Sequence, residues 1–147
     1  MILSSTEICR RLGDHSLTGG LVIRPFSEEC QQPASYDLRA DSDAVLKKGT
    51  CTLLSSLEWV ELPTDIAGTL RCRSSFGRRG VLLGAGFVDP GFRGQLTLCL
   101  SNMGSSDINI YRSDRIVQMI FHEVKAGGQL YQGRYQDSTG VVEADNA

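Results

Sequence analysis

The fold of this 147-residue chain is decided by one glycine-rich stretch, which reads GAGFVDPGFRGQLTLCLSN over residues 84–102. Its first half gathers glycines around Asp89, and glycine lets the backbone adopt a positive φ angle and approach a flat ligand closely. Its second half alternates apolar and polar residues, so that the leucines at 96, 98 and 100 share one face of a strand. The stretch therefore predicts a turn that carries one carboxylate and leads into a half-buried strand.

The opposite face of this strand carries polar side chains. Gln95, Thr97 and Cys99 alternate with the leucines and therefore point away from the face that the leucines bury. Asp89 can serve simply as a turn former in Asp-Pro-Gly, and Phe92 can be an ordinary core residue. A hairpin with exposed N–H and C=O groups can instead bind the edge of a pyrimidine, with Phe92 as a stacking face.

The rest of the pattern predicts an all-β protein with one short helix. Ser4 and Glu7 form a potential capping box, and Ile8, Leu12 and Gly13 then define a helix of about two turns. Short apolar runs between turn residues predict the strands. These runs are Leu21–Ile23, Cys51–Leu54, Trp59–Leu62, Gly68–Cys72, Val81–Leu83, Gln95–Leu100, Ile108–Tyr111 and Ile116–Glu123. Many short strands indicate a sandwich or barrel, here as a single domain over residues 1–147.

The C-terminal part of the chain has a different composition. From residue 126 onward it is polar and rich in glycine, and it has no apolar period that could bury one face. Composition alone therefore favours a disordered tail over residues 126–147.

Composition and charge exclude several classes of function. A net charge of −2 and a pI near 5.6 argue against binding a nucleic-acid polymer, which requires a cationic face. No apolar run approaches the roughly 20 residues of a membrane span, and the N-terminus lacks the basic and apolar regions of a signal peptide. We therefore expect a cytoplasmic protein without a membrane partner.

The cysteines argue against a metal centre. The chain has five cysteines and two histidines, and no two cysteines have CxxC spacing. This pattern does not fit a zinc site or a zinc-dependent deaminase. An odd number of cysteines in a cytoplasmic protein instead predicts reduced, mostly buried thiols.

A second polar cluster precedes the glycine-rich stretch. Residues 73–78 read RSSFGR and combine guanidinium groups with hydroxyls, which are suitable partners for a polyphosphate, although such clusters are also common on surfaces. Further along, Asp114 and Arg115 could form a simple surface ion pair. Gln118 lies within an apolar strand, where a buried amide requires hydrogen-bond partners.

Taken in their order along the chain, these motifs resemble those of the family of trimeric dUTPases and dCTP deaminases. The resemblance spans nearly the whole chain and rests on Pro33–Leu38, Arg73–Arg78, Gly86–Gly94 with its strand, Asp114–Gln118 and Tyr131–Gly140. The opening Met1–Ser4 and the segment Leu57–Pro63 are similar to the dCTP deaminase branch.

This resemblance implies a distorted β-barrel or jelly roll of the dUTPase-like β-clip type. It also implies a homotrimer with active sites between subunits, a deoxyribonucleoside triphosphate as substrate, and a flexible C-terminal segment that closes over it. The base and deoxyribose would contact Gly86, Phe87, Val88 and Phe92. The triphosphate would contact Arg73, Ser74, Ser75, Arg78 and Gln118. The closing segment would supply Tyr131, Arg134, Tyr135, Ser138 and Thr139.

The two activities of this family require different groups. Hydrolysis of dUTP to dUMP and pyrophosphate needs a carboxylate that activates water, and Asp89 matches that position. It also needs Mg²⁺, held mainly by the substrate phosphates, with Asp37 as a potential contributor through water. Family deaminases instead carry a glutamate where this chain has Cys99, and a thiol does not reproduce a carboxylate. The sequence therefore predicts a dUTP diphosphatase with Asp89 as its base.

Two alternatives stay open at this point. The first is a dCTP deaminase, or an enzyme with both activities, and Ser74 and Arg78 match the helper residues of that reaction. The second is an inactive nucleotide-binding regulator, which the absence of a glutamate at position 99 suggests.

Overall fold

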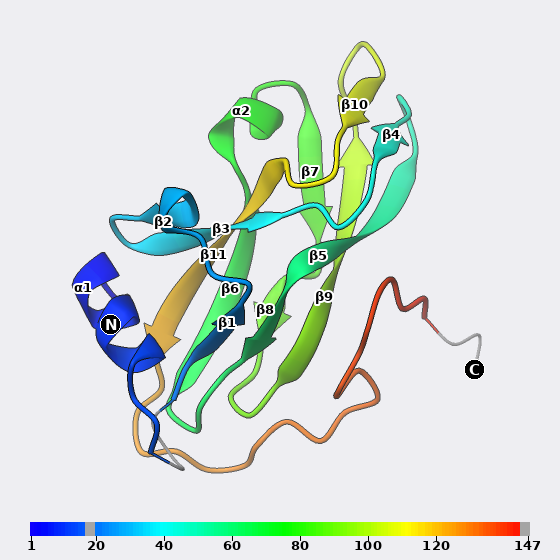
Figure 1. The fold of residues 1–147 in the computed structure, drawn as a ribbon. Helices are drawn as coiled ribbons and strands as arrows, with labels where there is room; N and C mark the ends of the chain where they lie inside the picture. Colours follow the sequence, from blue (N-terminus) through cyan, green and yellow to red (C-terminus); the bar gives the residue numbers. More distant parts are fainter. Residues whose placement is uncertain (17–19, 145–147) are drawn as a thin grey trace.

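The computed structural model describes residues 1–16 and 20–144, and it confirms an all-β fold with a short N-terminal helix (Figure 1). The helices are α1 (Ser5–Leu12), the 3-10 helix η1 (Glu28–Cys30) and α2 (Ser74–Gly77). The strands are β1 (Val22–Arg24), β2 (Gln31–Gln32), β3 (Ser35–Arg39), β4 (Ala44–Leu46), β5 (Cys51–Glu61), β6 (Ile66–Cys72), β7 (Val81–Gly84), β8 (Phe87–Val88), β9 (Arg93–Asn102), β10 (Ile108–Ile110) and β11 (Arg115–Glu123).

Two antiparallel sheets form the body of the molecule. One has the strand order β1-β5-β9-β7 and the other β2-β3-β11-β6-β8, while β4 and β10 form a separate pair. The two sheets share one apolar core, to which β9 contributes Leu98 and Leu100 and β11 contributes Val117 and Met119. The sheets do not close into a regular barrel. This agrees with the prediction, which was of a distorted barrel. Burial of the alternate residues of each strand holds the layers together.

Helix α1 begins where the sequence predicted. The Ser4 hydroxyl accepts a hydrogen bond of 3.3 Å from the Glu7 N–H, and Gly13 caps the C-terminus. Glu7 does not complete a capping box, because its carboxylate binds Arg10 instead. Ile8 is fully buried, and Arg11 is buried beside it with its guanidinium on an acidic partner.

Strand β5 contains an irregularity that supports the site described below. The pairing with β9 shifts register between Ser55 and Trp59, because residues 56–58 bulge out of the ladder. The bulge places Glu58 in the interior, where its carboxylate accepts bonds from the Arg39 N–H at 3.0 Å and from its Nε at 2.6 Å. What the sequence predicted as two strands is therefore one long bulged strand, Cys51–Glu61.

The C-terminal segment returns to the sheet that contains β9. Residues 126–144 run around one end of the molecule and then lie beside β9 (Figure 1). Backbone bonds join the Tyr131 N–H to the Pro90 carbonyl at 2.8 Å and the Asp137 N–H to the Arg93 carbonyl at 2.9 Å. Hydrogen bonds, together with the packing of Tyr131 against the core, attach residues 126–144 to the body of the molecule. The flexibility of this segment stays a prediction. Residues 145–147, also part of that prediction, lie outside the described residues.

Two further expectations concern the cysteines and the membrane. All five cysteines are free, but the prediction that most are buried is wrong: Cys30 is buried, whereas Cys9 and Cys51 are exposed and Cys72 and Cys99 are half-buried. Within residues 1–16 and 20–144, the structure contains no helix with the length and apolar character needed to cross a membrane.

Candidate functional site

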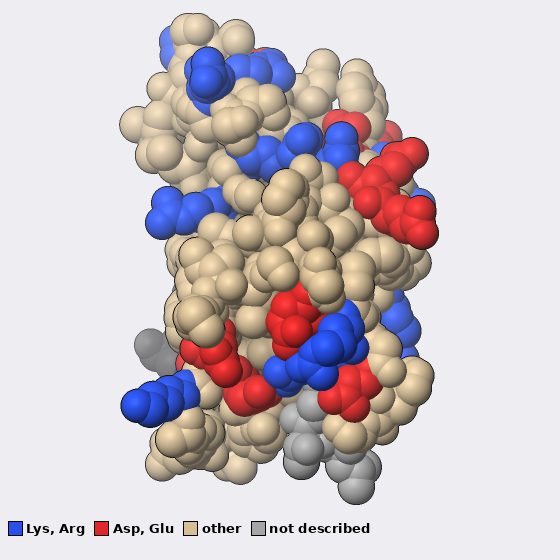
Figure 2. Space-filling view, turned by 90° about the vertical axis from the view of Figure 1, so that its left-hand side faces the viewer, with Lys and Arg blue, Asp and Glu red and all other residues tan. Residues whose placement is uncertain are grey.

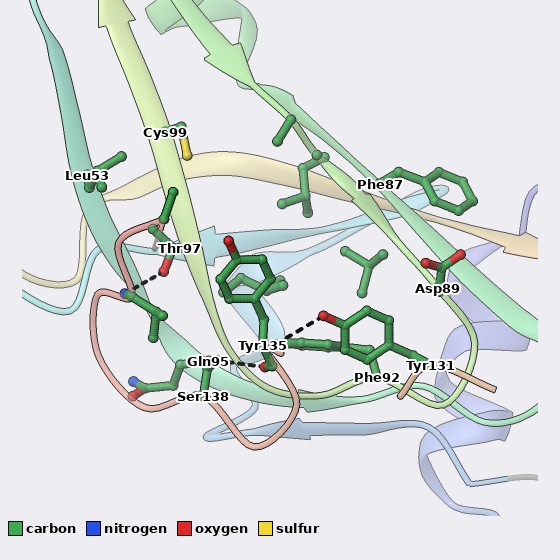
Figure 3. A pocket seen from close by; sticks show the side chains of 17 residues that line it. Leu53, Phe87, Asp89, Phe92, Gln95, Thr97, Cys99, Tyr131, Tyr135 and Ser138 are labelled. Carbon is green, nitrogen blue, oxygen red and sulfur yellow. Dashed lines mark hydrogen bonds between the residues drawn. The ribbon is translucent and has the colours of Figure 1, made fainter. Parts of the chain in front are cut away.

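A cavity of about 350 Å³ lies between β9, the glycine-containing connection from β7 to β8, and the C-terminal segment (Figure 3). β7 pairs with β9 and β8 pairs with β6, so the hairpin that the sequence suggested is not formed. The residues that line it are Leu53, Leu70, Ala85, Gly86, Phe87, Val88, Asp89, Phe92, Gln95, Leu96, Thr97, Cys99, Tyr131, Tyr135, Ser138, Val142 and Ala144. The structure thus brings together the glycine-rich stretch and part of the closing segment, as the resemblance implied. Sequence reasoning did not assign Leu53 or Val142 to the site.

Strand β9 forms the polar wall of the cavity. Gln95, Thr97 and Cys99 are half-buried on the face opposite to the buried leucines, as their alternation predicted. Burial, and to a lesser extent the neighbouring Cys51 thiol, raises the pKa of the Cys99 thiol. The thiol is therefore neutral at neutral pH, a form that can neither attack as a thiolate nor act as an efficient base.

The wall formed by the β7–β8 connection depends on unusual backbone angles. Ala85 has a φ of 61° and Gly86 a φ of 109°. A Cβ atom on Gly86 would lie 3.2 Å from the Leu70 carbonyl oxygen and 3.3 Å from the Leu83 side chain, so glycine is required here. The Gly86 carbonyl accepts a 2.7 Å bond from the Leu70 N–H, which fixes the β7–β8 connection against β6.

Two candidate residues occupy the turn after β8. Phe92 is 6% exposed and packs edge-to-face on Tyr131, with ring centroids 5.5 Å apart, so it joins the core to the closing segment. Asp89 and Cys99 lie on opposite sides of the close-up view (Figure 3). The cavity thus has a carboxylate toward one end and a thiol toward the other.

The closing segment forms the third wall. The Tyr131 hydroxyl accepts a bond of 3.2 Å from the Tyr135 N–H, and the Ser138 hydroxyl donates one of 2.6 Å to the Tyr135 carbonyl (Figure 3). These three predicted residues line the cavity, whereas Arg134 and Thr139 lie on the exposed side of the same segment.

The predicted phosphate-binding motif lies elsewhere. Ser74 and Ser75 begin α2, with Arg73 before it and Arg78 after it, and none of these residues lines the cavity. In Figure 1, α2 lies at the end of the molecule away from the C-terminal segment. Gln118 also lies outside the cavity lining, and its amide donates a 2.7 Å bond to the Ser35 hydroxyl. One chain therefore does not bring the predicted phosphate and base residues together.

Basic side chains gather near α2. Figure 2 shows Lys and Arg at the upper end of its face, an acidic group below them at the right edge, and a mixture of both toward the lower end. Arg73, Arg78 and Arg79 adjoin α2 in the sequence, so the motif lies in a basic environment. Such an environment favours an anionic ligand.

Asp37 has contacts that do not suit a magnesium ligand. It is 2% exposed, and its carboxylate lies 3.0 Å from the Arg73 Nε and 3.7 Å from an Arg115 nitrogen. Burial raises the pKa of Asp37, and the two guanidiniums oppose that shift. In the part of the chain that the structure describes, no three His, Cys, Asp or Glu side chains are grouped to hold a metal ion. Magnesium binding stays a prediction and would depend on the substrate phosphates.

Comparison with known proteins identifies the relatives of this chain. The family model described as dCTP deaminase-like matches residues 40–124. The dCTP deaminase of Pyrococcus abyssi is 37% identical over 147 residues, covering 89% of this chain and 96% of that protein. The dCTP deaminase of Thermococcus sibiricus is 35% identical over 144 residues, covering 86% and 92%. A dUMP-forming dCTP deaminase of Leifsonia xyli is 36% identical over 180 residues, covering 95% and 88%.

Solved structures confirm the fold class. The chain is similar to a dCTP deaminase from Agrobacterium tumefaciens with a TM-score of 0.68 and 21% identity, covering 84% of this chain and 47% of that one. It is also similar to the EIAV dUTPase with a TM-score of 0.64 and 19% identity, covering 79% and 98%. At these identities the similarity shows the fold alone.

These findings correct the predicted function. Hydrolysis of dUTP was the main prediction, but the similar curated proteins over most of the chain are dCTP deaminases, which was the alternative. The prediction gave weight to Asp89 and to the absence of a glutamate at position 99, whereas similarity along the whole chain is the stronger signal. Asp89 does line the cavity, and its assignment as a catalytic base stays a prediction. The family match and the identity over nearly the full length together show that this chain belongs to the dCTP deaminase-like family.

Proposed function

We propose that this chain acts on dCTP and removes ammonia from the cytosine ring. The observation that carries the proposal is the cavity walled by β9 and the β7–β8 connection, in a chain whose relatives are dCTP deaminases. Its volume of about 350 Å³ suits a small ligand, and its wall combines apolar surface with a few polar groups.

The chemistry requires proton transfer near the base. Water adds to C4 of cytosine, ammonia leaves from the same carbon, and C4 becomes the carbonyl carbon of uracil. One proton of the attacking water must reach the leaving amine, and the other ends on N3 of the uracil ring. A side chain close to C4 ordinarily carries such protons. In the proposed orientation the base lies between the β7–β8 connection and β9, near Thr97 and Cys99, and Phe92 lies against the deoxyribose.

The triphosphate would extend to the basic residues around α2. Ser74, Ser75 and Arg78 supply hydroxyls and a guanidinium suited to phosphate oxygens, and Gln118 supplies an amide. Magnesium, when bound, would neutralise part of the phosphate charge. These residues would have to come from a neighbouring chain, because in one chain they are not part of the cavity lining.

This requirement supports a homotrimer with sites between subunits, as the resemblance implies. We expect light scattering coupled to size-exclusion chromatography to give three times the 16.0 kDa mass of the chain. A monomeric mass at the concentration used for the activity assay would contradict this assembly.

The activity is tested by incubating the purified protein with dCTP and measuring ammonia. We expect one ammonia for each dCTP consumed, and chromatography will identify the nucleotide product as dUTP or dUMP. Incubation with dUTP, which has no 4-amino group, is the control for ammonia from other sources. Absence of ammonia from dCTP at enzyme concentrations equal to the substrate concentration would overturn the proposal.

One observation favours a second candidate function. Cys99 places a neutral thiol where family deaminases carry a glutamate, so the chain could bind dCTP as a regulator without converting it. Titration calorimetry and the ammonia assay together separate the two functions. A regulator would bind dCTP tightly in the calorimeter and release no ammonia in the assay.

A further inference from the structure

The C-terminal segment is attached to β9 by a regular series of hydrogen bonds. The Ser138 carbonyl accepts a 2.8 Å hydrogen bond from the Gln95 backbone N–H. The Gly140 N–H donates a 2.7 Å bond to the Gln95 Oε1. The Val142 N–H donates a 3.0 Å bond to the Thr97 Oγ1. Every second residue between 138 and 142 is thus hydrogen-bonded to this strand. Two of these three bonds use side chains of β9 rather than its backbone.

Strand β9 and the C-terminal segment approach each other very closely at the start of this series. Gly94 pairs with Ser138 in a parallel bridge, and a Cβ atom on Gly94 would lie 2.9 Å from the Ser138 nitrogen. A side chain at position 94 would therefore push the segment away. The sequence of β9 is adapted to hold this segment at short range.

Gln95 is held in one orientation by the protein itself. Its side-chain nitrogen donates to the Asp41 Oδ2 at 3.2 Å and to the Ser56 carbonyl at 2.9 Å, and both partners can only accept in these contacts. The amide nitrogen must therefore face Asp41 and Ser56. The Oε1 atom is left facing the Gly140 N–H, the donor that it binds. The bulge of β5 thus fixes the acceptor that captures the C-terminal segment.

We propose that Gln95 is a positioning residue that holds residues 138–142 as a wall of the nucleotide cavity. All the amide hydrogen-bonding contacts described above are made within the protein, so Gln95 acts through the segment rather than on the base. Ser138 and Val142 line the cavity and depend on this attachment for their place. The role in nucleotide binding rests on the proposed function, whereas the attachment itself does not.

The attachment is tested without nucleotide by hydrogen–deuterium exchange in the full-length protein. Gln95→Met keeps the length of the side chain but removes its polar atoms. We expect exchange of the Gly140 and Val142 amides to become about tenfold faster, the effect of losing one hydrogen bond. Ser101→Ala is the matched control, because Ser101 lies on the same face of β9 outside the cavity lining, and it should leave this exchange unchanged.

A second variant tests the segment without changing β9. Val142→Pro removes the N–H that binds Thr97, whereas Val142→Ala keeps it, so only the proline variant should show faster exchange at Gly140. Unchanged exchange at Gly140 in Gln95→Met, with an unchanged melting temperature, would overturn the proposal.

The link to the nucleotide is measured by the dissociation constant for dCTP. We expect Gln95→Met to weaken binding about tenfold and to raise KM more than it lowers kcat, because the segment closes the cavity. Faster exchange with unchanged dCTP affinity would overturn the role of the wall in binding. If the wild-type protein released no ammonia while Gln95→Met still accelerated exchange and weakened dCTP binding, the proposed deamination would fail and the positioning role would stand.

Discussion

Replacing Cys99 by glutamate will raise the rate of ammonia release from dCTP about 100-fold, the lower end of what general acid–base catalysis contributes. The side chain lies on the polar wall of the cavity, and burial keeps its thiol neutral by raising its pKa. A carboxylate at this position would accept the proton from water and return it to the leaving amine. The measurement is the initial rate of ammonia formation at saturating dCTP.

Two further variants make this result specific. Cys99→Gln introduces a side chain with the shape of glutamate but without an ionisable carboxyl group, so it should not gain activity. The wild-type rate should rise toward alkaline pH as the thiol ionises, and Cys99→Ser should lose that rise. A wild-type rate equal to or above that of Cys99→Glu would show that proton transfer uses another group and that the thiol is not the limitation.

Much of the fold could be predicted because alternation reports burial directly. The leucines of β9 fall on the buried face, and the Ser4 cap places the start of α1 correctly. The bulge at residues 56–58 could not be predicted, because it breaks the alternation and depends on a buried ion pair with a distant strand. Helix α2 is only four residues long and buries no side chain, so it leaves no apolar period in the sequence.

The candidate site was predictable where neighbours in the sequence are also neighbours in space. Asp89, Phe92 and Cys99 belong to one contiguous stretch that runs from the turn after β8 into β9, and the structure places all three around one cavity. Gln95 was noted only for its direction, because its role depends on Asp41 and Ser56, which no local pattern connects to it. In the proposed homotrimer, the relation between α2 and the cavity would depend on assembly, which no local pattern in one chain specifies.

The largest loss of stability is expected from Arg39→Leu. Glu58 is fully buried, and Arg39 provides its charge partner through the guanidinium as well as a backbone N–H. Removing the guanidinium leaves a buried carboxylate without a compensating charge, which costs about 3–5 kcal/mol. Urea unfolding followed by circular dichroism should show this decrease in the free energy of unfolding.

The pH dependence of this loss identifies its cause. Burial raises the pKa of Glu58, and the bond from Arg39 opposes that shift, so the pKa should rise further in Arg39→Leu. A raised pKa in the folded state means that the native protein retains a proton that the unfolded chain has lost. Stability then falls as the pH increases from the unfolded pKa through the folded one. The destabilisation should therefore be largest at neutral pH and become smaller toward pH values at which Glu58 is protonated in both states.

A second substitution separates charge from packing. Glu58→Gln in the Arg39→Leu background removes the buried charge and should recover part of the lost stability and most of the pH dependence. Arg10→Leu is the control, because the exposed pair between Arg10 and Glu7 is screened by solvent and should contribute little. Equal destabilisation by Arg39→Leu at all pH values, without recovery in the double variant, would mean that Arg39 stabilises the bulge of β5 by packing alone. The buried pair would then not be what holds Ser56 in place beneath Gln95.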